Sequence, residues 1–255
     1  MARRTASNLA SAKTAGADVA NRSTADVVLR ADGLNVGYNR IPVVVDLELE
    51  VRAGELVALL GSNGAGKTTT LMALAGVLQP SVGTVELLGA PTKAPLHVRT
   101  KRGLGLVTEE RSVIFGLSVM DNLRLARGDI SLALDLFPEL KPLLRRRAGL
   151  LSGGEQQILA LARTMSKSPK VLLADELSLG LAPLVVQRLL AALRDVASTG
   201  VGVLLVEQQV AHALGTSDRA YVMRRGKIVL SGPSKDLLAR IDQIEATYFS
   251  AAAEV

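Results

Sequence analysis

The 255-residue chain contains no cysteine and only two histidines. The absence of cysteine excludes disulfides and cysteine-based metal sites, and it is typical of proteins from a reducing compartment. The histidines, His97 and His212, lie too far apart along the chain to indicate a shared metal site. We therefore expect no metal site built from cysteine and histidine.

Aromatic residues are also scarce: they make up 2 % of the chain, with no tryptophan, whereas 48 % of the residues are hydrophobic. The core must therefore be aliphatic, which suits a buried parallel sheet covered by helices. The net charge is +6, but a nucleic-acid surface would also need aromatic side chains for base stacking. We expect no nucleic-acid partner, and contact of the basic segments with acidic lipid headgroups is the alternative.

No hydrophobic run in the sequence approaches the roughly 20 residues of a membrane-spanning helix. Residues 1–26 contain arginines but lack the apolar segment that a secretory signal needs. Their Ala, Ser and Thr content resembles a transit peptide weakly and favours a disordered tail, or a start codon assigned too far upstream. We expect residues 27–255 to form a single domain.

Short apolar strands alternate with helical segments along most of the chain. The repeated order of strand, helix and strand requires parallel pairing with right-handed crossovers. Half-exposed alternating segments at the start and end indicate antiparallel strands, and a helical periodicity from Ser118 to Leu150 is broken at Pro138 and Pro142. The sequence therefore predicts an α/β fold with a parallel core sheet, an antiparallel β subdomain and a helical subdomain inserted at about residues 100–165.

A glycine-rich loop, "GSNGAGKTT", stands between an apolar strand and an apolar helix. It matches the G-x-x-x-x-G-K-[ST] pattern, in which backbone N–H groups surround the β-phosphate of a nucleotide. The lysine would reach the β and γ oxygens, the first threonine would ligate Mg²⁺, and the second would bond the α-phosphate. The predicted nucleotide contacts are Gly61, Ser62, Asn63, Gly64, Ala65, Gly66, Lys67, Thr68 and Thr69.

Two acids end the apolar strand "VLLADE". Asp175 at the strand tip is positioned to hold the hydration shell of Mg²⁺ opposite Thr68, and Glu176 to polarise an attacking water. An acid pair that caps the next helix is the alternative, but the phosphate loop upstream favours the catalytic interpretation.

A second candidate anion site occurs in "LLSGGEQQ", where Ser152, Gly153 and Gly154 open a predicted helix. Free N–H groups and the positive end of the helix dipole favour an anion there. The phosphate loop already engages one nucleotide, so the natural ligand of this second site is a γ-phosphate held by a facing subunit.

The order of phosphate loop, "LSGGE" and "VLLADE" resembles the nucleotide-binding subunits of ABC transporters, from about Val27 to Leu238. The resemblance implies a P-loop NTPase core, ATP and Mg²⁺ as cofactors, and ATP hydrolysis coupled to transport. It also implies a peripheral position on the cytoplasmic face of the membrane. The implied partners are integral membrane permease subunits, a second copy or a related ATPase subunit, and, indirectly, an extracytoplasmic solute-binding protein.

The family pattern also carries over to three single positions. Tyr38 resembles the aromatic residue that stacks on adenine, and Glu109 falls where a linking glutamine senses Mg²⁺ and water. Gln208 falls where most members have a switch histidine that contacts the γ-phosphate. "VTEER" and "LVEQQ", around Glu109 and Gln208, and "SLGLAP" after Glu176 are similar to the subgroup that takes up branched-chain amino acids and amides.

The sequence departs from that subgroup at Thr108, Glu110, Phe115 and Leu177, and Glu155 stands where glutamine is more common. These positions lie where the membrane subunit and the partner ATPase would make contact. We expect import of branched-chain or hydrophobic amino acids. Urea or amide uptake and export are the alternatives within transport, and a soluble non-transport ABC ATPase is a further alternative.

Overall fold

The computed structural model describes residues 26–242 and 244, apart from residues 40 and 111. The expected tail at residues 1–26 therefore lies outside the described residues, except for Asp26. Among the described helices, none combines the length and the hydrophobicity needed to cross a bilayer.

A six-stranded sheet forms the core, in the order β10-β9-β3-β8-β7-β6. All neighbouring strands pair in parallel except β10, which pairs antiparallel with β9 at one edge. The central strands are almost continuously apolar because both faces of the sheet are covered. The strands are β3 (Leu56–Leu60), β6 (Leu104–Val107), β7 (Val171–Asp175), β8 (Gly202–Glu207), β9 (Arg219–Arg224) and β10 (Lys227–Pro233).

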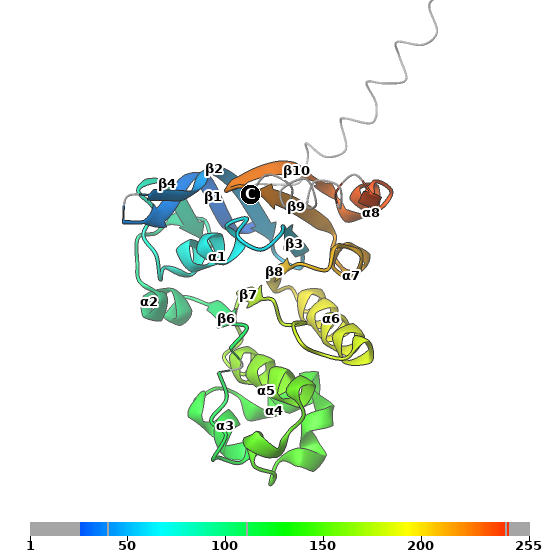
Figure 1. Ribbon diagram of the computed structural model, residues 1–255. Helices are drawn as coiled ribbons and strands as arrows, with labels where there is room; N and C mark the ends of the chain where they lie inside the picture. Colours follow the sequence, from blue (N-terminus) through cyan, green and yellow to red (C-terminus); the bar gives the residue numbers. More distant parts are fainter. Residues whose placement is uncertain (1–25, 40, 111, 243, 245–255) are drawn as a thin grey trace, which may run out of the picture.

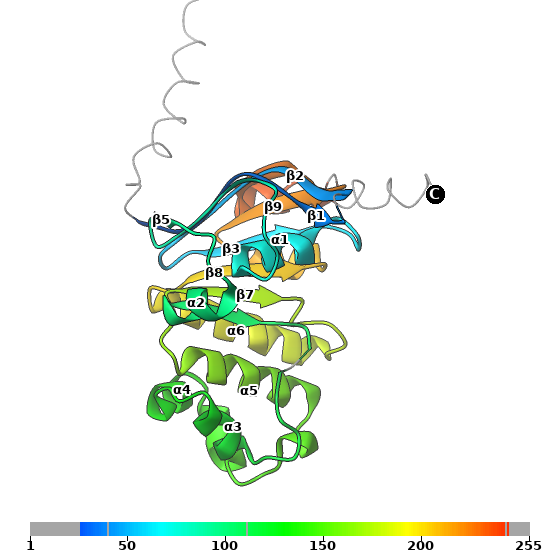
Figure 2. The same ribbon diagram turned by 90° about the vertical axis from the view of Figure 1, so that its left-hand side faces the viewer.

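A second, antiparallel sheet has the order β2-β1-β4-β5. Figure 2 shows it stacked above the core sheet, with helix α1 between the two layers. Aliphatic side chains from both sheets and α1 form one continuous hydrophobic core there. The strands are β1 (Val27–Tyr38), β2 (Ile41–Arg52), β4 (Val82–Leu87) and β5 (Ala90–Pro91).

The opposite face of the core sheet is covered by α6 and α5, and the short helices α3 and α4 lie beyond α5 (Figures 1 and 2). Strand β6 belongs to the core sheet, so the helical subdomain begins only after it. Pro138 opens the 3₁₀ helix η2 and Pro142 lies inside it, whereas a proline would break the interior of an α-helix. The helices are α1 (Lys67–Ala75), α2 (Leu96–Lys101), α3 (Val119–Leu125), α4 (Ile130–Leu136), η2 (Pro138–Leu143), η3 (Ala148–Leu150), α5 (Gly153–Met165), α6 (Pro183–Ser198), α7 (Val210–Thr216) and α8 (Ser234–Leu238).

The C-terminal end of α1 is held by Arg99, a fully buried arginine in α2. Its guanidinium donates to the carbonyl oxygens of Ala73 and Leu74, at 3.1 and 2.6 Å, and of Thr92 and Ala94. The carbonyls of the last helical turn have no partner within the helix, so this side chain satisfies them. The helix that begins at the phosphate loop is thereby fixed at its far end.

Candidate nucleotide-binding site

The phosphate loop connects β3 to α1 and closes on itself through Lys67. Lys67 is only 4 % exposed, and its Nζ donates to the carbonyl oxygens of Gly61, at 2.8 Å, and Ser62, at 3.3 Å. Gly66 has a φ of 107°, which favours glycine. A side chain on Gly61 would lie 2.7 Å from the backbone oxygen of Met223. The glycines are therefore required by backbone geometry and by close packing.

Adjacent strands of the core sheet bring Lys67, Glu176 and Gln208 together. Strands β3, β8 and β7 are neighbours, so their carboxyl ends meet at one edge, where ligands bind in open α/β sheets. Lys67 Nζ lies 3.1 Å from Glu176 Oε1, and Gln208 Nε2 donates to Glu176 Oε2 at 2.6 Å. Three residues singled out from separate motifs of the sequence thus form one polar cluster.

The backbone of Glu176 is held in an uncommon conformation. Its φ is 44°, in the left-handed region, and its N–H donates to the carbonyl oxygen of Val206 in the neighbouring strand β8 at 2.9 Å. Such conformations persist only where the surroundings impose them, and they gather at functional sites. The carboxylate of Glu176 is therefore directed toward Lys67 by the backbone as well as by its partners.

Asp175 is a buried carboxylate at the tip of β7. The pKa of Asp175 is raised to about 6, mainly by burial and also by the negative charges of Glu176 and Glu109. The positive charge of Lys67 and a hydrogen bond from Thr68 act in the opposite direction and lower this pKa. The Oδ1 atom of Asp175 is buried without a hydrogen-bond partner. Among the described residues, no group of three or more His, Cys, Asp or Glu side chains could hold a metal ion. A Mg²⁺ ion held mainly by phosphates and water, with few protein ligands, fits these observations.

Tyr38 ends β1 beside the phosphate loop. The start of β2 contacts that loop, since a side chain on Gly66 would lie 3.3 Å from Val44 Cγ2. Tyr38 pairs with Ile41 across the hairpin, and its side chain is 49 % exposed. Tyr38 is therefore accessible, and it belongs to the hairpin whose second strand contacts the phosphate loop.

The residues of the second anion site, Ser152, Gly153 and Gly154, lie at the start of α5 in the helical subdomain, in a different layer from α1 (Figure 1). Ser152 Oγ accepts from the N–H of Glu155 at 3.3 Å, and the Glu155 carboxylate accepts from the N–H of Ser152 at 2.7 Å. In this reciprocal capping box, the negatively charged carboxylate of Glu155 is held at the N-cap of its own helix. The arrangement explains how a glutamate is accommodated beside a predicted anion site.

One residue of the cluster was not predicted from the sequence. Glu207 is buried and accepts hydrogen bonds from Ser178 and Gln208. A signal was present, because an acid that ends the apolar strand "GVLLVE" is as unusual as the pair that ends "VLLADE". Glu109, by contrast, is exposed, and its influence on the cluster is the charge that it exerts on Asp175.

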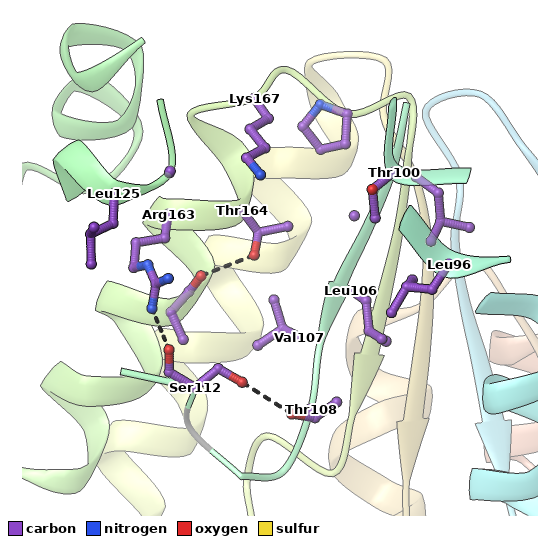
Figure 3. A pocket seen from close by; sticks show the side chains of 15 residues that line it. Leu96, Thr100, Leu106, Val107, Thr108, Ser112, Leu125, Arg163, Thr164 and Lys167 are labelled. Carbon is purple, nitrogen blue, oxygen red and sulfur yellow. Dashed lines mark hydrogen bonds between the residues drawn. The ribbon is translucent and has the colours of Figure 1, made fainter. Parts of the chain in front are cut away.

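A separate groove of about 430 Å³ lies between the core sheet and the helical subdomain (Figure 3). Residues of α2, β6 and α5 line it, together with Thr108 and Ser112, which flank Glu109 along the chain. Arg163 Nη1 donates to the carbonyl oxygen of Ser112 and ties this segment to α5. None of the phosphate-loop residues line the groove, so it is distinct from the polar cluster.

Residues 44–178 match the family model described as ABC transporter. The chain belongs to the ABC transporter family. The family predicted from the order of phosphate loop, "LSGGE" and acidic strand is thus confirmed, and the chain is an ATP-binding subunit and an ATPase.

Three relatives show how similar this ABC ATPase is to known subunits. It is 39 % identical over 225 residues to the high-affinity branched-chain amino acid transport ATP-binding protein BraG of Pseudomonas aeruginosa, covering 83 % of this chain and 95 % of the relative. It is 35 % identical to the probable branched-chain amino acid transport ATP-binding protein LivF of Archaeoglobus fulgidus, covering 83 % and 94 %. It is 34 % identical to the lipopolysaccharide export system ATP-binding protein LptB of Acidithiobacillus ferridurans, covering 83 % and 92 %.

The fold is also that of solved ABC cassettes. The dimeric structure of MJ0796, a bacterial ABC transporter cassette, superposes with a TM-score of 0.71 at 21 % identity, covering 81 % of this chain and 98 % of that one. This likeness confirms the predicted α/β P-loop architecture with its antiparallel and helical subdomains.

Proposed function

We propose that this ABC ATPase powers the import of branched-chain or other hydrophobic amino acids. The observation that carries the cargo proposal is the pair Glu109 and Gln208 at positions where most ABC ATPases have glutamine and histidine. The identities to BraG and LivF support the same cargo. In this proposal the subunit sits on the cytoplasmic face of the membrane beneath two permease subunits, which receive solute from an extracytoplasmic binding protein. The groove of Figure 3 is where we expect a permease segment to dock.

The roles of the site residues follow from the polar cluster. Tyr38 stacks on adenine, and residues 61–69 surround the phosphates. Lys67 exchanges its bond to Glu176 for the β and γ oxygens, which frees the Glu176 carboxylate to orient the attacking water. Gln208 holds Glu176 in place and hydrogen-bonds the γ-phosphate, but it cannot become positively charged as a histidine can.

Mg²⁺, when bound, would neutralise charge on the β- and γ-phosphates. Thr68 and Asp175 would be its protein partners, because Asp175 has a buried oxygen without a partner and hydrogen-bonds to Thr68. Glu109 would act at the edge of the same site through water.

Export is the second candidate function, and the 34 % identity to LptB is the observation that favours it. Urea or amide uptake is a further alternative, because the motifs around Glu109 and Gln208 are shared with amide importers.

Labelled leucine uptake by a strain that lacks this gene separates import from export. We expect high-affinity leucine uptake to fall to background in the deletion strain and to return with the wild-type gene. The Glu176→Gln gene should fail to restore uptake, and the purified variant should hydrolyse ATP at least about 100-fold more slowly, because the group that orients water is altered. Unchanged leucine uptake in the deletion strain would refute the cargo, and a wild-type ATPase rate in Glu176→Gln would refute the role of Glu176.

A further inference from the structure

Glu207, the last residue of β8, is a buried acid with three hydrogen-bond donors around its carboxylate. Its side chain is 3 % exposed. Ser178 Oγ donates to Oε2 at 2.7 Å, the Ser178 N–H donates to Oε1 at 3.3 Å, and the Gln208 N–H donates to Oε2 at 3.3 Å. All three donors are neutral groups. One carboxylate therefore joins two loops that leave adjacent strands of the core sheet.

These contacts connect Glu207 to the proposed catalytic glutamate by two routes, one through Ser178 and one through Gln208. Ser178 follows Glu176 by two residues, and Gln208 follows Glu207 directly. Gln208 Nε2 returns to Glu176 Oε2 at 2.6 Å, and the N–H of Glu176 donates to Val206. Gln208 therefore contacts both acids, because its backbone N–H donates to Glu207 and its side chain donates to Glu176. Displacement of either loop would therefore move the Glu176 carboxylate.

The chemistry of the three contacts requires a carboxylate at position 207. Two backbone N–H groups and one hydroxyl converge on it, and an ionised carboxylate offers acceptors only. A glutamine amide would direct its own N–H₂ group at one of these donors, because only one of its two terminal atoms accepts. A buried acid without a cationic partner is also costly for folding, so stability alone gives little reason for an acid here.

We propose that Glu207 is a positioning residue, which locks Ser178 and the backbone of Gln208 so that Gln208 holds the Glu176 carboxylate in its catalytic orientation. This inference rests on the roles proposed above for Glu176 and Gln208. Among the described residues, the Glu207 carboxylate hydrogen-bonds to Ser178 and Gln208, and in this proposal it acts through these two residues.

The test compares Glu207→Gln with Glu55→Gln, a matched variant. Glu55 is also a buried glutamate with protein hydrogen bonds, to the Arg52 N–H and Arg219, but it precedes β3 at the opposite end of the strand from Gly61. For the full-length chain we would measure kcat, KM, the Kd of a fluorescent ATP analogue and the melting temperature. We expect Glu207→Gln to lower kcat about 10- to 100-fold, the order of loss that a small misplacement of catalytic groups causes. Its Kd should change by less than about 2-fold, because the phosphate loop is intact, and Glu55→Gln should retain the wild-type kcat.

A double-mutant cycle distinguishes positioning from a general structural role. In a Gln208→Ala background, Glu207→Gln should add little further loss, since the bond that it positions is already absent. Ser178→Ala should lower kcat and Ser178→Thr should restore most of it, because threonine keeps the hydroxyl. If Glu207→Gln fails to fold, the kcat values of the two Ser178 variants test the positioning role instead.

Three outcomes overturn the inference: a wild-type kcat in Glu207→Gln, equal wild-type rates in both Ser178 variants, or full additivity with Gln208→Ala. Failure of the proposed function is recognised separately, because Glu176→Gln would then hydrolyse ATP at the wild-type rate.

Discussion

Glu207 contributes to the pH dependence of the protein's stability, as does Asp175, the other buried carboxyl group among the described residues whose pKa is raised. Burial raises the pKa of Glu207, and the nearby charge of Glu176 adds to the effect, while the hydrogen bonds from Ser178 and Gln208 oppose it. In the unfolded chain a glutamate titrates near its usual pKa of about 4.3. Between these two pKa values the folded state keeps a proton that the unfolded state has lost, so the free energy of unfolding decreases as pH rises.

We expect Glu207→Gln to lose the part of this decrease that Glu207 contributes, because glutamine does not titrate, whereas the part that comes from Asp175 remains. Urea denaturation of the two proteins from pH 4 to pH 8 measures the effect, and the difference in their free energies of unfolding should change across the window above about pH 4.3. A constant difference at all pH values would contradict the assignment of the raised pKa to Glu207.

Single residues also show what could be predicted from the sequence. The phosphate loop stands out because its glycines, lysine and threonine match one pattern between a strand and a helix, and Asp175 stands out because an acid at the end of an apolar strand has few structural explanations. The capping box of Ser152 and Glu155 has a recognisable sequence pattern, Ser-x-x-Glu. Glu207 also has one, because it is the single acid at the end of an apolar strand. The Lys67–Glu176 ion pair could not be predicted from the sequence. It forms because two strands that are more than 100 residues apart in the sequence lie near each other in the sheet.

Helices α5 and α6 touch at Gly154, and their contact depends on the missing side chain. A methyl group at Gly154 would overlap Val185 Cγ1 in α6. Overpacking of this kind costs about 1–3 kcal/mol. We expect Gly154→Ala to lower the free energy of unfolding by about that amount, and the added substitution Val185→Ala to recover part of it, as measured by chemical denaturation.

Gly215 supplies the control for this element-scale prediction. It lies inside α7, and a methyl group there would meet nothing within 4 Å. Gly215→Ala should raise the free energy of unfolding by about 0.5–1 kcal/mol, because alanine favours the helix. Equal effects of the two glycine substitutions would show that contact with Val185 does not limit position 154.

Elements with a strong local signal were predicted well. The buried strands β3, β7 and β8 are continuous apolar runs, and α6 begins at Pro183, a preferred first helical residue. The anchoring of α1 by Arg99 had no local signal, because the guanidinium bonds carbonyls more than 20 residues away. An arginine in a sequence is usually interpreted as exposed, and only the fold reveals a buried one.

Ser152 begins α5 in the helical subdomain, whereas the phosphate loop leads into α1 in a different layer of the molecule (Figures 1 and 2). The solved cassette MJ0796 is itself dimeric. For this chain we expect each ATP to lie between the phosphate loop of one subunit and Ser152 of its partner, in a dimer of two copies or with a related ATPase. Chains of Lys67→Ala and Ser152→Ala should then each lose ATPase activity alone and regain it when mixed, since one mixed site contains neither substitution.

The control for this experiment is a mixture of Lys67→Ala with Glu176→Gln. Both residues belong to the same site of one chain, as their ion pair shows, so no intact site forms and activity should stay absent. Recovery in the control, or none in the first mixture while each variant still dimerises with ATP, would contradict a site shared between subunits. Lack of ATP-dependent dimerisation would instead point to a different ATPase as the partner.

The Lys67–Glu176 ion pair places the carboxylate of Glu176 in competition with any anion that approaches Lys67. The carboxylate is tethered beside the lysine by the Gln208 hydrogen bond, so its effective concentration there is far above that of any free ion. Inorganic phosphate or sulfate must displace it with few contacts in return, whereas a nucleoside triphosphate brings a stacking base and a full row of phosphate oxygens. We therefore expect inorganic phosphate and sulfate to compete only weakly with a nucleoside triphosphate for Lys67.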